Sequence, residues 1–234
     1  MIPIISTEEM LELEKGIANT EQLMEEVAIF ISSFIVEKGY TSCLIISGSG
    51  NNGADAILTG LYLIQKGISC TLWCLKDSKE GSLHEKQKKR FLKAGGSMIE
   101  SLPESTHSFS CVLDGLFGIG FRGEVEGLAK EAILWINQQK RDVLSRDVLS
   151  IDCPSGLDTK TGKASYAVNA TYTLICHLPK WGLFLHDGFK YCGTLVVIPL
   201  SLPITRNNKI FLVTENDVQE KMPQLERTRN KYST

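Results

Sequence analysis

The stretch CLIISGSGNNGADAILTGLYLIQKGISCTLWCL, residues 43–75, combines a strand, a glycine-rich turn, a helix and a second strand. The apolar run 43–47 predicts a buried strand, residues 54–66 place apolar side chains at helical spacing, and residues 68–75 predict another strand. A helix that connects two strands in this way makes them parallel and packs against one face of the sheet. The stretch therefore predicts an α/β fold.

The alternation of helices and strands extends in both directions along the chain. Ser6 or Thr7 and then Thr20 are expected to begin two helices ahead of the first strand, the second running to about Glu37. The later elements expected are a helix near 82–94, a strand at 110–114, a helix near 124–139 and strands at 148–152, 170–176 and 194–199. The segment between the last two strands is rich in loops, and we expect an antiparallel hairpin there. These elements predict a three-layer αβα sandwich, Rossmann-like, with a mostly parallel central sheet.

Length and composition limit the classes of protein to consider. The chain has 234 residues, 43% of them hydrophobic and 22% charged, with a net charge of -2. We expect one domain over residues 1–218 and a polar tail or the start of a linker over 219–234. The near-neutral charge gives no reason to expect nucleic acid or a membrane as a partner.

The cysteines and the amino terminus indicate the compartment. The seven cysteines are odd in number, scattered and mostly set in apolar runs, as in proteins of a reducing environment. No stretch approaches the ~20 apolar residues of a membrane span, and the first residues do not resemble a signal peptide. We therefore expect a cytoplasmic protein.

Three loops follow predicted strands, at the edge of the sheet where α/β proteins bind their ligands. The first is GSGNNGAD at 48–55, which opens a helix whose free amides and dipole attract phosphate. Its two asparagines and Asp55 add oxygens that suit a hard cation or ribose hydroxyls. The alternative is a tight turn with no ligand.

The second loop is DGLFGIGFRG at 114–123, and the third is IDCPSGLD at 151–158. Arg122 suits a phosphate, although Asp114 alone is also consistent with a buried side chain that caps the turn. In the third loop Asp152 ends its strand and Ser155 occupies the tip of a rigid turn. Neither Cys153 nor Ser155 has the local sequence of a nucleophile.

Taken together and in this order, the three loops closely resemble the signatures of the NAD(P)HX epimerase family, also called the YjeF amino-terminal domain family. The segments 170–174, 180–183 and 193–203 extend the resemblance, which covers residues 6–215. Members of that family interconvert the R and S epimers of NADHX and NADPHX, the hydrated and damaged nicotinamide cofactors, so that an S-specific dehydratase can restore them. The resemblance also implies a homodimer, and the tail lies where many relatives continue into a dehydratase domain.

By motif position the resemblance assigns residues to the substrate and to one potassium ion per subunit. The substrate would be bound by Asp152 and by two loop segments, which are Asn51, Asn52, Gly53, Ala54 and Asp55 together with Gly118, Ile119, Gly120, Phe121, Arg122, Gly123 and Glu124. Potassium would be held by Asn52, Asp114 and Ser155, whose oxygens are hard ligands.

Inversion at the damaged carbon needs an acid and a base, whether water leaves and returns or the ring opens and recloses. Asp152 is the expected proton shuttle, and Lys76 after the second strand is its candidate partner, although a solvated lysine would fit that position equally well. Two alternatives remain: a NAD-dependent dehydrogenase with Asp77 on the ribose, and a non-catalytic nucleotide-binding or dimerisation scaffold.

Two features depart from the family pattern. Ala54 and Ala56 flank Asp55 where the family has glycines, and a methyl group at 54 is expected to narrow the approach to the ligand. The pentapeptide RDVLS occurs twice, at 141–145 and 146–150. Because only the second copy continues into Asp152, we expect residues 148–150 to be the buried strand and residues 141–145 to be an exposed insertion.

Overall fold

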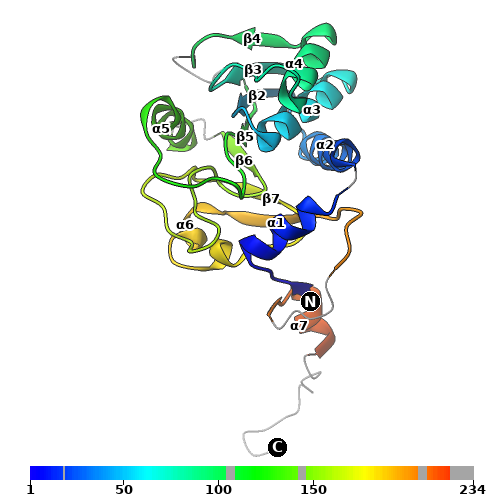
Figure 1. The fold of residues 1–234 in the computed structure, drawn as a ribbon, viewed down its shortest axis with the longest axis vertical. Helices are drawn as coiled ribbons and strands as arrows, with labels where there is room; N and C mark the ends of the chain where they lie inside the picture. The colour runs from blue at the N-terminus through cyan, green and yellow to red at the C-terminus, as the bar shows by residue number, and fades with distance from the viewer. Residues whose placement is uncertain (18, 104–108, 142–145, 205–209, 222–234) are drawn as a thin grey trace, which may run out of the picture.

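The protein is built around a seven-stranded parallel sheet, with strand order β4-β3-β2-β5-β6-β7-β8 (Figure 1). The computed structural model describes residues 1–17, 19–103, 109–141, 146–204 and 210–221, without the side chains of 140 and 141. The strands are β2 (Ser42–Ser47), β3 (Ser69–Cys74), β4 (Ser97–Ile99), β5 (Cys111–Gly115), β6 (Asp147–Ile151), β7 (Tyr172–Cys176) and β8 (Thr194–Ile198). Every strand pair in this sheet is parallel, so the expected αβα architecture is confirmed.

Helices cover both faces of the sheet. One face packs against α2 (Thr20–Glu37), α3 (Asn51–Gln65) and α4 (Leu83–Lys93), and the other against α5 (Gly127–Arg141). Along β2 the side chains alternate accordingly, since Cys43 and Ile45 face α2 and α3 whereas Leu44 and Ile46 face α5. Figure 1 shows α2 and α3 on the opposite side of the sheet from α5.

Shorter elements complete the fold around β7 and the chain ends. They are α1 (Thr7–Lys15), the 3-10 helix η1 (Trp181–Phe184), α6 (Gly188–Tyr191), α7 (Glu215–Lys221) and a two-stranded ribbon of β1 (Ile2–Pro3) with β9 (Phe211–Leu212). Ser6 caps α1 with its side chain, and Glu9 returns a hydrogen bond to the Ser6 backbone. Met10 of α1 packs in the same apolar cluster as Ile175 of β7, so α1 lies against the part of the fold that contains β7.

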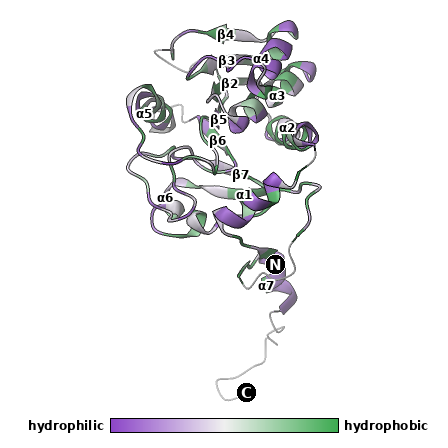
Figure 2. Ribbon diagram, in the orientation of Figure 1, coloured by the Kyte–Doolittle hydropathy of each residue, from purple (hydrophilic) through white to green (hydrophobic). Residues whose placement is uncertain are grey.

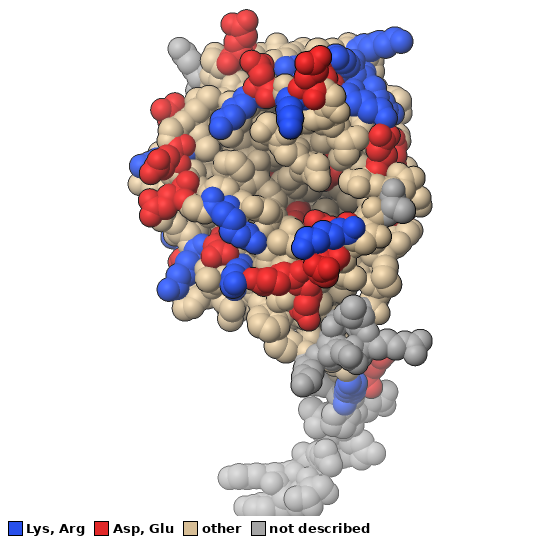
Figure 3. Space-filling model, in the orientation of Figure 1, with Lys and Arg blue, Asp and Glu red and all other residues tan. Residues whose placement is uncertain are grey.

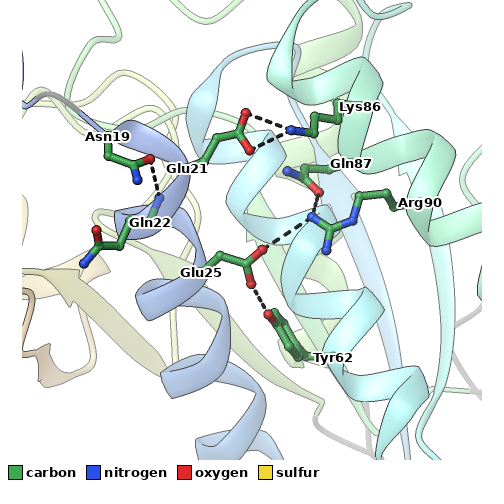
Figure 4. Close-up of polar contacts among 8 residues, drawn as sticks. All are labelled: Asn19, Glu21, Gln22, Glu25, Tyr62, Lys86, Gln87 and Arg90. Atoms are coloured by element: carbon green, nitrogen blue, oxygen red, sulfur yellow. Dashed lines mark hydrogen bonds and ion pairs between the residues drawn. The ribbon is translucent and has the colours of Figure 1, made fainter.

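Polar contacts fasten α2 to α3 and α4 (Figure 4). Glu25 accepts hydrogen bonds from the Tyr62 hydroxyl of α3 and from Arg90 Nη1 of α4, the latter at 3.4 Å. Glu21 pairs with Lys86 of α4 at 2.6 Å. Exposed ion pairs of this kind stabilise little individually, so the main contribution is the buried apolar face of α2. Most of α4 is hydrophilic, with Phe91 as its anchor in the core (Figure 2).

Two sequence expectations need correction or completion. The antiparallel hairpin expected between the last two strands is wrong, because β7 and β8 are parallel and the chain crosses between them through η1 and α6. Of the polar tail or linker predicted at 219–234, the structure describes only the end of α7, to Lys221; residues 222–234 lie outside the described part.

The duplicated pentapeptide is resolved in part. The second copy supplies β6, whose residues 148–150 are fully buried, as expected. Of the insertion predicted at 141–145, Arg141 is instead the last residue of α5, and residues 142–145 lie outside the described part.

The described residues form no disulfide bond and no membrane-spanning helix. All seven cysteines are free thiols. In the same part of the chain no helix combines the length and the apolar character needed to cross a membrane.

Candidate functional site

The site lies where the strand order reverses. From β2 the chain moves outward to β3 and β4, then returns to the other side of β2 with β5. Such a switch point separates the loops that follow the two central strands and opens a crevice between them. A cavity of about 590 Å3 occupies this position, walled by α1, α2 and the loops after β2, β3, β5 and β6. Figure 3 shows that this face is hollowed near its middle and that acidic and basic side chains alternate around the hollow.

The first loop contributes three of its five predicted residues to the cavity wall. Asn51, Asn52 and Asp55, all in the first turns of α3, line it. Gly53 does not, because it packs against the Gly48 carbonyl and the Ser47 side chain. Ala54 does not either: its methyl group is fully buried in an apolar cluster with Met24, Ala28, Leu58 and Leu61. Alanine at this position therefore packs against α2 and does not narrow the cavity.

The second loop lies between two cavities. Gly118, Ile119, Gly120 and Phe121 line the 590 Å3 cavity. Arg122, Gly123 and Glu124 line a neighbouring cleft of about 720 Å3, to which Phe121 also contributes. Arg122 Nη1 donates to the carbonyls of Ile119 and Phe121 at 2.8 and 2.7 Å, so the arginine stabilises the loop that it belongs to.

Asp152 reaches the cavity from the end of β6 in a constrained conformation. Its φ of 67° lies in the left-handed region, which is uncommon for a residue with a side chain, and its N–H donates to the Leu174 carbonyl at 2.7 Å. Its Oδ1 accepts a hydrogen bond of 2.5 Å from Lys180 Nζ, and that lysine is completely buried. Burial by itself would lower the pKa of Lys180, but the surrounding negative groups, Asp152 above all, raise it.

Sequence reasoning did not identify Lys180 as a site residue. Its segment, residues 180–183, was noted only as part of a wider resemblance. The signal available was its position just after β7, the strand next to β6, because the carboxyl ends of neighbouring parallel strands lie at one edge of the sheet.

Two further carboxyl groups share the cavity with Asp152. Burial raises the pKa of Glu14, at the end of α1, to about 6, and the nearby Asp152 adds to the shift. More than a third of the Glu14 residue is exposed, so the shift belongs to a carboxyl at the cavity wall and not to a core group. Burial, followed by the charges of Asp152 and Glu14, holds the pKa of Asp55 well above its usual range. The cavity therefore contains acids that differ in how readily they release a proton.

The two candidates on the β3 side take different positions. Lys76 is exposed and lines the cavity on the side of β3. Asp77 is exposed and lines neither cavity. A dinucleotide bound in the cavity would therefore not place its ribose against Asp77, the contact that the dehydrogenase alternative requires.

Of the residues predicted to hold potassium, Asp114 and Ser155 form a buried hydrogen-bonded cluster, and Asn52 lines the cavity. Asp114 is completely buried; its Oδ1 accepts from Ser155 Oγ at 2.6 Å and Leu116 N at 3.2 Å. Its Oδ2 accepts from Ser150 Oγ at 2.7 Å and Ser155 N at 3.0 Å. Asn52 approaches from α3, and a Cβ atom at position 118 would lie 3.4 Å from its amide oxygen.

The Asn52 amide is unusual, because its nitrogen is buried and has no hydrogen-bond partner among the described residues. Within the same residues, Asp114 forms no ion pair. The oxygens of Asp114, Ser155 and the Asn52 carbonyl are of the hard type that a monovalent cation takes as ligands, whereas the unpaired Asn52 nitrogen is a hydrogen-bond donor and needs an acceptor.

A buried histidine supports the first loop from behind. His84 of α4 places Nε2 2.9 Å from Ser47 Oγ and Nδ1 2.7 Å from Ser78 Oγ. Ser47 Oγ in turn donates to the Gly48 carbonyl at 2.9 Å. Burial and the nearby Lys88 lower the pKa of His84, so the ring is neutral and acts as a fixed link between α4 and the start of the glycine loop.

Comparison with known proteins shows the family of this chain. The family model described as YjeF-related protein N-terminus matches residues 20–182. An NAD(P)H-hydrate epimerase of Entamoeba histolytica is 30% identical over 202 residues, which cover 82% of this chain and 83% of that protein. Another, from Limosilactobacillus reuteri, is 29% identical, with 83% of this chain and 93% of that protein covered.

A longer relative and a solved structure extend the comparison. A bifunctional NAD(P)H-hydrate repair enzyme of Dictyoglomus turgidum is 31% identical over 220 residues, and the chain spans 42% of its length. The crystal structure of yeast ynu0 superimposes with a TM-score of 0.69 at 16% identity, covering 83% of this chain and 87% of that one, which supports the fold. With the family model matching well over half of its residues, this chain belongs to the YjeF amino-terminal family.

Proposed function

We propose that this protein is an NAD(P)H-hydrate epimerase, an isomerase that interconverts the R and S epimers of NADHX and NADPHX. Relatives that carry this name cover most of the chain at about 30% identity. The observation that carries the proposal is the position of Asp152, which enters the cavity paired with a buried lysine and faces Glu14 and Asp55, two carboxyl groups whose pKa burial raises. A base and two acids in one cavity are what an epimerisation by proton transfer requires.

The reaction inverts the configuration of one carbon and leaves the composition of the substrate unchanged. At the damaged carbon, protonation of the hydroxyl lets water depart as the ring nitrogen shares its lone pair, and water then adds to the opposite face and loses a proton. A ring opening and reclosure would need the same two proton transfers. In either route one carboxyl gives a proton and a carboxylate takes one back, so the cavity ends the cycle in its starting state.

The substrate would lie along the edge of the sheet. The start of α3, with Asn51, Asn52 and Asp55, and the glycine loop at 118–121 would bind the phosphates and ribose, because free amides and a helix amino terminus attract phosphate. The nicotinamide hydrate would face Asp152. Lys76, exposed at the cavity rim, would approach the phosphates or the reacting ring from the side of β3.

Potassium is proposed as the ion that completes the buried oxygen cluster, one per subunit. Asn52, Asp114 and Ser155 would hold it, and its charge would balance that of the Asp114 carboxylate. Since these residues come from α3, β5 and the loop after β6, the ion would fasten together the three loops of the site.

We also propose the surroundings in which the enzyme works. The fusion of this type of domain in bifunctional repair enzymes supports functional coupling to an S-specific dehydratase. A homodimer in the cytoplasm is proposed, and the free thiols of all seven cysteines are consistent with a reducing compartment.

The test is epimer exchange. R-NADHX is incubated with the purified chain in potassium buffer, and the R to S ratio is followed by chromatography. We expect wild type to speed equilibration, Asp152→Ala to abolish the acceleration, and Asp77→Ala, an exposed carboxylate outside the cavities, to match wild type. If wild type binds nucleotide tightly but does not speed equilibration of the epimers, the epimerase proposal is rejected and the non-catalytic scaffold remains.

A further inference from the structure

Lys180 lies behind the cavity and not in its wall. The residue has no exposed surface, whereas the Asp152 side chain retains 9% exposure and lines the cavity. The backbone around the lysine is fixed on both sides by Ile5, whose N–H donates to the Pro179 carbonyl at 3.0 Å and whose carbonyl accepts from Trp181 N–H at 3.1 Å. The lysine therefore approaches Asp152 from a rigid position beneath the site.

The contacts of the ammonium group leave one face of the aspartate free. Two of its three donors are used, one on Asp152 Oδ1 at 2.5 Å and one on the Cys176 carbonyl at 3.0 Å. In the described part of the chain no hydrogen bond engages Asp152 Oδ2. The lysine thus holds one carboxylate oxygen and leaves the other available to a molecule in the cavity.

Two carboxyl groups that face Asp152 oppose its negative charge, Glu14 on α1 and Asp55 on α3. The other groups around it are the thiols of Cys176 and Cys153, which burial keeps neutral, and Lys76 at the cavity rim. Among the three carboxyl groups of the cavity, Asp152 alone has an ion pair within the described residues. Lys180 therefore places a fixed positive charge against one of the three acids and against neither of the others.

We infer that Lys180 is a positioning residue of the reaction: from beneath the cavity its ammonium group holds one oxygen of Asp152 and leaves the other oxygen to the substrate, so that Asp152 accepts the proton and the neighbouring acids supply it. The inference rests on the proposed epimerase function and adds a residue to it. Lys180 itself does not touch the substrate.

Removal of this lysine has a defined consequence. Without the ammonium group Asp152 would compete with Asp55 and Glu14 for a proton, because each would then be an unpaired carboxyl in the same cavity. Loss of an opposite charge within contact distance raises a carboxyl pKa by about one unit or more.

The experiment compares Lys180→Met, Lys180→Arg and Lys93→Met, an exposed lysine at the end of α4. For each we would measure kcat and KM for R-NADHX against pH, and titrate Asp152 by carboxyl 13C NMR in the full chain. Lys180→Met is expected to move the acidic limb of the profile and the Asp152 titration up together by about one pH unit or more, with KM changed less than kcat. Lys93→Met should match wild type.

Lys180→Arg keeps the inference testable if the methionine variant does not fold. Arginine retains the positive charge but changes its position. The acidic limb of the pH profile should therefore stay at its wild-type pH while kcat falls on the order of 100-fold, the usual effect of displacing a catalytic group by about 1 Å. A folded Lys180→Met with unshifted Asp152 titration, or a Lys180→Arg with wild-type kcat, would overturn the inference. If wild type shows no epimerase activity, the proposed function fails, and the NMR titration still decides whether Lys180 controls Asp152.

Discussion

Replacing Gly48 by alanine should separate the two loops on which the site depends. A Cβ atom at position 48 would lie 1.9 Å from the Leu116 carbonyl oxygen and 2.9 Å from its carbon. Both atoms belong to backbone next to paired strands, since Ser47 of β2 is in register with Gly115 of β5 and Gly48 N–H donates to the Gly115 carbonyl at 3.1 Å. Because the clashing atoms are backbone atoms, no side-chain rotation can relieve the contact, and the backbone must move.

The magnitude follows from that movement. The loops must part by roughly 1 Å, which costs about 1–3 kcal/mol for overpacking, and the hydrogen bond to Gly115 is lost at about 1 kcal/mol. We expect Gly48→Ala to lower the free energy of unfolding by about 2–4 kcal/mol. The matched control is Gly50→Ala, because a Cβ at position 50 meets nothing within 4 Å and Gly50 has an extended backbone that alanine adopts.

Equilibrium urea unfolding, followed by the fluorescence of the three tryptophans, measures both variants. Gly50 is the amino-terminal cap of α3, where alanine is less favourable than glycine, so its substitution should cost under about 1 kcal/mol. Equal destabilisation by the two alanines would refute the reasoning, since only position 48 lies against Leu116.

Three other results are expected. The pKa of Glu14 is about 6 in the folded protein against an ordinary 4.5, so the folded state binds this proton more tightly and the protein loses stability as the pH rises from about 4.5 through 6. Glu14→Gln should therefore raise the melting temperature at pH 8 and leave it nearly unchanged at pH 4.5. An equal rise at both pH values would contradict this. Deletion of 141–145 should leave melting temperature and epimerisation near wild type, because the second RDVLS supplies β6; loss of the fold would show that the first copy is structural. Asn52→Ala should weaken the stimulation of epimerisation by potassium over sodium, and an unchanged potassium response would remove Asn52 from the ion site.

Part of this protein was predictable because it depends on local sequence. The unit at 43–75 predicts strand, turn, helix and strand from periodicity alone, and β2, α3 and β3 begin and end within a few residues of the expected positions. The rule that ligands bind at the carboxyl ends of parallel strands then brought Asn52, Asp55, Gly118 and Asp152 to one cavity without any knowledge of their contacts.

Other features depended on packing between distant segments. The expected hairpin failed because glycines in a loop do not reveal whether the next strand pairs in parallel or antiparallel, and here η1 and α6 carry the chain across to a parallel β8. Ala54 was expected to narrow the ligand site, yet the rotation of α3 directs its methyl group into the contact with α2.

The proton chemistry of the site shows the same division. The sequence by itself determined that Asp152 stands at a strand end among possible ligands. Only the tertiary structure decided its partners, because Lys180 is 28 residues away along the chain and Glu14 lies on a helix that precedes the whole sheet. Charge, burial and pKa depend on which groups share a cavity, and that is set when α1 and the segment after β7 close around the edge of the sheet.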